Sequence, residues 1–312
     1  MADEAKTRWR AIVSQPVDVA DFRPLSSDLA VEVAAVSLCG RLHTHNTDHY
    51  LALRFGRLQE TLVTSLAAGD LPPRFEEYAY AMLVADGLGE AEDGARASRV
   101  ALSTLARLAI KYGRWNVRAD EETLAEIVQQ GEFFYRRAND AIMHARQADL
   151  HLTDMATSLT ALYISEDHLT FAHVGHSRAY LLRNGELVQL TKDHVVAYPA
   201  DVEQFQYIKQ LKSDFGHIVL KAVGDDAAAA GVEIEQVTLS GGDRLLLCTN
   251  GLTDLIDDDR IADTLALKRQ PGEDCERLID LARSSGAPDD VTVMVADYRH
   301  LSTRFTPTPP IS

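Results

Sequence analysis

Ala81-Met82-Leu83-Val84-Ala85 is an apolar run that leads directly into Asp86-Gly87-Leu88-Gly89. A second run, Leu245-Leu246-Leu247-Cys248-Thr249, leads into Asn250-Gly251, and Asp289-Asp290 leads into a third, Val291-Thr292-Val293-Met294-Val295. Buried strands are rigid, so the oxygen donors at their ends are held in place, which suits Mg²⁺ or Mn²⁺. Asn250 is the odd member, because an amide stands where a carboxylate is expected.

Length and composition are those of an ordinary globular protein with one large core or two domains. The chain has 312 residues, of which 46% are hydrophobic and 25% charged. Its net charge of −16 argues against non-specific binding to nucleic acid or to anionic membranes. No apolar run reaches membrane-spanning length, and the N-terminus has no apolar signal region. Three cysteines are too few for a disulfide framework, and we interpret them as packed thiols in a reducing cytoplasm.

Hydrophobic periodicity predicts the regular elements. Strands are predicted over 31–38, 51–55, 81–85, 158–165, 168–174, 178–183, 186–190, 232–239, 244–249 and 291–296. Helical spacing predicts helices over 97–109, 124–145, 258–267 and 272–284. Asn184-Gly185 separates two of the strands and is the strongest short hairpin signal that a sequence offers. Residues 192–218 have no regular period and are interpreted as a surface excursion.

The order of these elements indicates the fold class. Hairpin strands with helices grouped between them do not form a βαβ array, and they predict antiparallel sheets covered by helices, an α+β layered fold. We expect the domain to occupy residues 31–299. Residues 1–30 form an N-terminal extension, and the proline-containing tail at 300–312 is expected to be disordered.

Several segments together resemble the metal-dependent, type 2C protein serine/threonine phosphatases. Each segment alone is a weak signal, but they follow the order of that family over residues 31–298. The segments are Asn46-Thr47-Asp48, Val84–Gly89, Gly94–Arg99, Thr157–Leu159, Val174–Leu181, Leu190–His194, Gly242–Leu247, Thr249–Asp254 and Pro288–Thr292.

This resemblance implies an α-β-β-α four-layer sandwich, with two antiparallel sheets packed face to face and helices on both outer sides. It also implies a site between the sheets for two or three Mn²⁺ or Mg²⁺ ions, which activate water for in-line hydrolysis of a phosphate ester. Asp48, Asp86 and Asp289 would then carry the catalysis, and His43 would face the substrate phosphate. The implied metal ligands are Asp48, Asp86, Gly87, Asn250, Asp289 and His176, with Asp254 and Asp290 just behind them.

The chain departs from the family pattern at residues that matter for this chemistry. Asn250 replaces a metal-binding aspartate, and His176 replaces an aspartate that supports an additional ion. Imidazole favours Mn²⁺ over Mg²⁺, so Mn²⁺ is the expected ion. His43 replaces a phosphate-gripping arginine and cannot offer the same two-pronged fork. Asp290 replaces an asparagine, so the summed charge of positions 250, 289 and 290 is unchanged. We hypothesise that Asp290 partly compensates for Asn250 through a water or a local bulge, although adjacent strand residues point to opposite faces.

More than one function agrees with this pattern. The leading hypothesis is a cytoplasmic, monomeric phosphatase of phosphoserine and phosphothreonine proteins, with a serine/threonine kinase or its targets as partners. The alternative is a catalytically weak or silent relative that binds a phosphorylated partner or serves as a regulatory scaffold. A third hypothesis is a phosphatase of small phosphoesters.

Two minor features carry open interpretations. His43 and His45 alternate along the chain near His49, so they could bind Zn²⁺, or they could lie in a solvated loop with one phosphate-facing histidine. The aromatic and apolar residues at 205–208 could form a flap over the substrate or could anchor a loop to the core.

Overall fold

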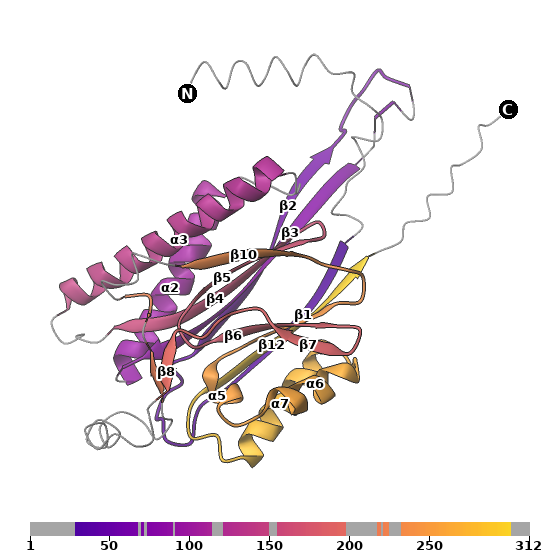
Figure 1. The fold of residues 1–312 in the computed structure, drawn as a ribbon. Coiled ribbons are helices and arrows are strands. Elements are labelled where there is room, and N and C mark those ends of the chain that lie inside the picture. Colours follow the sequence, from indigo (N-terminus) through magenta and orange to yellow (C-terminus); the bar gives the residue numbers. More distant parts are fainter. Residues whose placement is uncertain are drawn as a thin grey trace.

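Two five-stranded antiparallel sheets lie face to face at the centre of the structure (Figure 1). The computed structural model describes residues 29–67, 70–71, 74–89, 91–113, 121–149, 155–197, 217–219, 221–224 and 232–300. The first sheet has the strand order β1 (Leu29–Leu38), β12 (Val291–His300), β11 (Arg244–Cys248), β6 (Arg178–Arg183) and β7 (Glu186–Gln189). The second sheet has the order β10 (Glu233–Thr238), β5 (His168–Val174), β4 (Ala156–Ser165), β3 (Arg74–Leu88) and β2 (His49–Glu60).

Alternate residues of the central strands fill the space between the sheets. Leu245 and Leu247 of β11 belong to the same core cluster as Met82 and Val84 of β3. The intervening residues of β11 point to the opposite face of the first sheet, because successive side chains in a strand alternate. Both faces of β11 are therefore buried, which explains its continuous apolar sequence.

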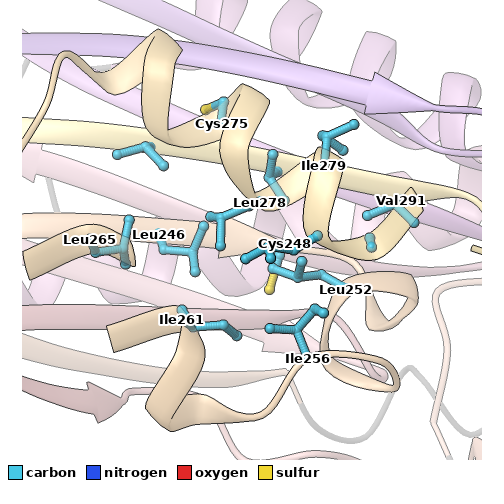
Figure 2. Packing of buried hydrophobic residues seen from close by; sticks show 14 of the residues in the cluster. Leu246, Cys248, Leu252, Ile256, Ile261, Leu265, Cys275, Leu278, Ile279 and Val291 are labelled. Carbon is cyan, nitrogen blue, oxygen red and sulfur yellow. The ribbon is translucent and has the colours of Figure 1, made fainter. Parts of the chain in front are cut away.

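Helices cover both outer faces of the sandwich (Figure 1). The outer face of the second sheet packs against α2 (Ala91–Tyr112) and α3 (Glu121–Ala148). The first sheet is covered by α5 (Asn250–Thr253), α6 (Asp258–Ala266) and α7 (Pro271–Ser284). Figure 2 shows the labelled residues of α6 and α7 gathered around Leu246 and Cys248. The predicted α-β-β-α four-layer sandwich is confirmed.

Several predicted elements have the observed bounds, and others are longer. The strands predicted over 168–174 and 178–183 are β5 and β6 without change. The Asn184-Gly185 hairpin is present, with positive φ angles of 53° and 86°, as a tight two-residue turn requires. The strands β2 and β3 extend well beyond the predicted 51–55 and 81–85.

The excursion predicted over 192–218 is only partly described. Its described ends contain two short strands, β8 (Val195–Ala197) and β9 (His217–Val219), which pair with each other and were not predicted. The residues at 205–208, most of the N-terminal extension and most of the tail lie outside the described residues. Among the described residues, no helix is long and apolar enough to span a membrane.

Candidate metal centre and active site

Carboxylates from four chain segments gather at one end of the sandwich. Asp86 lies near the end of β3, Asp48 directly precedes β2, Asp289 closely precedes β12, and Asp254 follows α5. In an antiparallel arrangement these strand ends lie at the same edge of the two sheets. The four carboxylates are close enough for the charges of Asp48, Asp289 and Asp254 to raise the pKa of Asp86.

Asp86 and Asp48 are the buried pair at the centre of this cluster. Their exposed fractions are only 7% and 6%. Burial raises the pKa of Asp86 well above its usual value, and the charge of Asp48 raises it further. Burial also raises the pKa of Asp48 to about 7. Two buried carboxylates that oppose each other's ionisation require either protons or a cation.

Thr249 fixes one oxygen of Asp48 and leaves the other without a hydrogen bond. Its hydroxyl donates to Oδ2 of Asp48 at 2.8 Å and accepts the backbone N–H of Thr292 at 2.9 Å. Oδ1 of Asp48 is buried and has no hydrogen-bond partner among the described residues. A buried anionic oxygen without a donor is costly, and a divalent cation ligated by oxygen removes that cost.

Glycines bring the main chain of β3 against the first turns of α2. A Cβ atom on Gly87 would lie 2.3 Å from the carbonyl carbon of Gly94, so only glycine fits there. The hydroxyl of Ser98, further along α2, donates to the backbone oxygen of Thr47 at 2.6 Å. The segment before Asp48 and the turn after Asp86 are thus both held against α2.

Asp289 and Asp290 have different environments although they are neighbours. Asp289 is partly exposed, and burial raises its pKa. Asp290 is 2% exposed and accepts hydrogen bonds from the N–H of Gly40 at 2.7 Å and from the N–H and hydroxyl of Thr47 at 2.7 and 2.8 Å. Burial acts to raise the pKa of Asp290, but these hydrogen bonds outweigh it and lower the pKa below its usual value. Both oxygens of Asp290 are therefore occupied by the segment 40–47.

His43 lies beside this pair. Its Nδ1 is 3.0 Å from Oδ2 of Asp290 and 3.6 Å from Oδ1 of Asp289. Burial acts to lower the pKa of His43, but Asp290 and then Asp289 outweigh it and raise the pKa, which favours the cationic imidazolium. Ligand atoms of His43, Asp289 and Asp290 lie within 4.8 Å of one another, close enough to share an ion.

Asn250 begins α5 at the end of β11. Its Nδ2 donates to Oδ2 of Asp254 at 3.1 Å. The amide nitrogen is therefore committed to Asp254, and the amide oxygen is the atom that can coordinate a cation. A Cβ on the next residue, Gly251, would lie 2.0 Å from the backbone oxygen of Asp290, so the α5 turn packs directly on the Asp290-Val291 peptide.

His176 is buried and faces an ion pair. Its Nε2 lies 3.5 Å from Oδ2 of Asp193, which Arg178 also contacts through Nε and Nη2 at 2.6–3.0 Å. Burial acts against ionisation of Asp193, but His176 and Arg178 hold its pKa below the usual range. The backbone N–H of His176 donates to Ser158 Oγ at 3.1 Å, and Ser158 pairs with Asp86 across β3 and β4. His176 is therefore close to the carboxylate cluster in the fold, with its imidazole turned to Asp193.

The three histidines of the 43–49 segment do not converge on one point. His45 is exposed, and Nδ1 of His49 contacts the hydroxyl of Ser98 at 2.9 Å. Among the described residues, the only histidine in a candidate metal cluster is His43, which is grouped with Asp289 and Asp290. The zinc interpretation of these histidines therefore gains no support.

No role was predicted from the sequence for Thr249 or for the partners of His176 and Asp290. Thr249 directly precedes Asn250, and Arg178 and Asp193 belong to two of the segments that resemble the family. Their positions in the sequence therefore indicated proximity to the site but not what each side chain contacts.

Comparisons with known proteins agree with this fold. The sequence profile of the family described as Protein phosphatase 2C matches residues 74–281. The serine/threonine protein phosphatase PstP of Mycobacterium tuberculosis is 32% identical over 217 residues, which cover 69% of this chain and 40% of PstP. The serine/threonine phosphatase stp of Listeria welshimeri is 29% identical over 217 residues, 69% of this chain and 83% of that protein.

Solved structures are also similar. The crystal structure of the PstP catalytic domain in complex with two manganese ions has a TM-score of 0.62 and 28% identity, covering 87% of this chain and 99% of that domain. Stp1 from Staphylococcus aureus, at 21% identity and a TM-score of 0.63, shares the fold and covers 86% of this chain and 95% of its own. This chain belongs to the PP2C-type family of serine/threonine protein phosphatases.

Proposed function

We propose that this chain is a divalent-metal-dependent phosphatase that hydrolyses phosphoserine and phosphothreonine in proteins. The observation that carries the proposal is the buried pair Asp48 and Asp86, whose pKa values are both raised by burial and by neighbouring carboxylates, and which include an oxygen without a donor. Such a pair is costly in a metal-free protein and becomes favourable when a cation binds.

The residues present fit a pair of Mn²⁺ or Mg²⁺ ions. Asp86 and Asp48 supply buried carboxylate oxygens, Asp289 a partly exposed one, and Asn250 an amide oxygen, all of which are hard ligands. The tight contact of Gly87 with Gly94 fixes the backbone beside Asp86. When bound, the ions supply an activated water and neutralise charge on the phosphate.

His43 is the proposed phosphate-facing group. Its position beside Asp289 brings it to the edge of the carboxylate cluster, and one third of its side chain is exposed to solvent. The raised pKa favours a cation, which an anionic substrate requires. His43 takes the place of the family's arginine, but its imidazole is shorter and cannot form the two parallel hydrogen bonds that a guanidinium donates to a phosphate.

His176 is proposed to influence metal choice rather than to hold a core ion. Its Nε2 already faces Asp193, so a third ion would have to compete with the Asp193–Arg178 pair. We therefore propose two ions, with Mn²⁺ preferred, as in the manganese-bound structure of the similar PstP catalytic domain. The partner class is phosphorylated protein.

Phosphate release from a phosphothreonine peptide tests the proposal. We expect turnover with Mn²⁺, less with Mg²⁺, and none in EDTA. Asp86→Asn should abolish turnover, whereas the matched control Asp263→Asn, which removes an exposed carboxylate on α6, should not. Binding of the peptide without turnover under any divalent ion would instead support the silent binding module. Turnover of small esters alone would support the small-phosphoester phosphatase.

A further inference from the structure

We infer that Asp290 is a positioning residue, which fixes the 40–47 segment and orients His43 toward the substrate phosphate instead of ligating the ions. This inference rests on the proposed function of the site. It gives Asp290 a different role from charge compensation for Asn250.

The first support is the number and direction of the contacts that Asp290 makes. Its carboxylate accepts the N–H of Gly40 on Oδ1, and the N–H and hydroxyl of Thr47 on Oδ2. Nδ1 of His43 also lies 3.0 Å from Oδ2. The two oxygens thus accept three hydrogen bonds from one segment, and the imidazole of His43 lies beside them as an ion-pair neighbour without a hydrogen bond of its own. This leaves little capacity for a direct bond to a cation.

The second support is how closely the segment is joined to the chain before β12. The N–H of Arg41 donates to the backbone oxygen of Ala287 at 2.8 Å, and the N–H of Leu42 donates to that of Pro288 at 3.1 Å. A Cβ on Gly40 would lie 2.3 Å from the carbonyl carbon of Asp289. Asp290 completes a clasp, defined here as these contacts between residues 40–47 and 287–290.

The third support is the chemistry of the position. All the groups around the carboxylate are donors, and a carboxylate has only acceptors, so each contact can form. An asparagine would turn an NH₂ group toward some of these donors and lose their hydrogen bonds. The clasp uses both oxygens of residue 290 as acceptors and therefore fits an aspartate better than an asparagine.

The consequence for catalysis is the orientation of the imidazole. Nδ1 is buried 3.0 Å from Oδ2 of Asp290, so Nε2 is the ring nitrogen that remains for an anion, and rotation of the ring would separate the imidazole from this carboxylate. An arginine reaches a phosphate with a long, self-sufficient fork, whereas a short imidazole depends on where its backbone and ring are held. Asp290 supplies that hold.

Binding of inorganic phosphate to the Mn²⁺-loaded protein tests this role by calorimetry, without any need for turnover. We expect Asp290→Asn to weaken phosphate binding by about ten-fold, because the clasp that places His43 loses a hydrogen bond from Gly40 or Thr47 to a charged group. Mn²⁺ affinity should fall by less than phosphate affinity, since Asp290 acts on the proposed ligands Asp48, Asp86 and Asp289 only through its charge, and its oxygens are taken up by the clasp. In phosphopeptide kinetics the same variant should raise KM more than it lowers kcat.

A double-mutant cycle distinguishes positioning from a general structural effect. If Asp290 acts through His43, then His43→Ala with Asp290→Asn should bind phosphate no more weakly than His43→Ala alone. Thr264→Val is the matched control, because it removes a buried hydroxyl that bonds to Arg260 within α6, far from the site. It should lower the melting temperature without changing phosphate affinity.

Two results would overturn the inference. One is a loss of Mn²⁺ affinity in Asp290→Asn with phosphate affinity unchanged, and the other is full additivity in the cycle. If Asp290→Asn does not fold, a crystal structure of the unmodified protein with inorganic phosphate provides the test. In that structure, Nδ1 of His43 must remain in contact with Asp290 while Nε2 binds the phosphate; any other orientation of the ring would contradict the inference. A protein that binds Mn²⁺ and phosphate in this way but releases no phosphate from peptides would contradict the proposed function and leave the positioning role intact.

Discussion

Replacing Asp48 with asparagine should stabilise the metal-free protein while it removes metal binding. The carboxylate is 6% exposed and its pKa is raised from 3.8 to about 7 by burial and by its acidic neighbours. A raised carboxyl pKa means that the folded protein binds a proton more tightly than the unfolded chain does. Its contribution to stability is therefore fully present below the unfolded pKa and is lost as the pH rises through about 7.

The size of this stabilisation follows from the rise in the pKa of Asp48. A rise of about three pKa units at ~1.4 kcal/mol each gives about 4 kcal/mol as an upper bound above pH 7. This is a large part of a total stability of about 5–15 kcal/mol. An asparagine at position 48 keeps an oxygen for the Thr249 hydroxyl but carries no charge, so we expect the variant to be stabilised by about 2–4 kcal/mol at pH 8.

Urea unfolding in EDTA at pH 5 and pH 8 measures this effect. The stability difference between Asp48→Asn and the unmodified protein should be small at pH 5 and large at pH 8. Saturating Mn²⁺ should stabilise the unmodified protein and leave the variant unchanged. Asp263→Asn is the control for loss of an exposed charge. A variant that is less stable than the unmodified protein at pH 8 in EDTA would refute the electrostatic reasoning.

Three further predictions concern the same framework. Gly87→Ala should lower Mn²⁺ affinity and stability, because its Cβ would lie 2.3 Å from Gly94; calorimetry and thermal melting measure both. Asn250→Asp should raise Mn²⁺ affinity by about ten-fold, because it adds a carboxylate ligand, and calorimetric Mn²⁺ titration would measure this. It should also lower the stability of the metal-free protein, because the new carboxylate would face Asp254; urea unfolding in EDTA would show a higher stability if this reasoning were wrong. Arg244→Leu should destabilise the fold by about 3–5 kcal/mol in urea unfolding, since it leaves Asp274 and Asp297 without their buried partner; a loss below ~1 kcal/mol would be inconsistent.

The sequence predicted the fold where local pattern and burial agree. β11 is buried on both faces and β5 is bounded by clear turns, so their apolar runs match the observed strands. The strand β2 extends past Phe55 because pairing with β3 continues to Glu60, although the added residues are exposed and do not alternate in polarity. Pairing between strands, which a single segment does not reveal, decided these bounds.

For the candidate site, the sequence predicted which residues can act as metal ligands but not the contacts that hold them. Asp48, Asp86 and Asp289 stand at strand ends, where the sequence pattern and the resemblance both put them. The roles of Asp290, Thr249 and His176 depend on contacts with residues that are far away in the chain or on another element. Thr249 contacts Asp48 across 201 positions, and Asp290 contacts Thr47 across 243. Such contacts appear only when the chain has folded.

A crystal structure of the protein soaked in Mn²⁺, with the ions located by anomalous scattering, tests the central claim most directly. We predict two ions at the carboxylate cluster, which Asp48, Asp86 and Asp289 would hold together with the amide oxygen of Asn250. Asp290 should stay on Gly40 and Thr47. A single ion, or no ion at Asp86 in fully folded protein, would contradict the account.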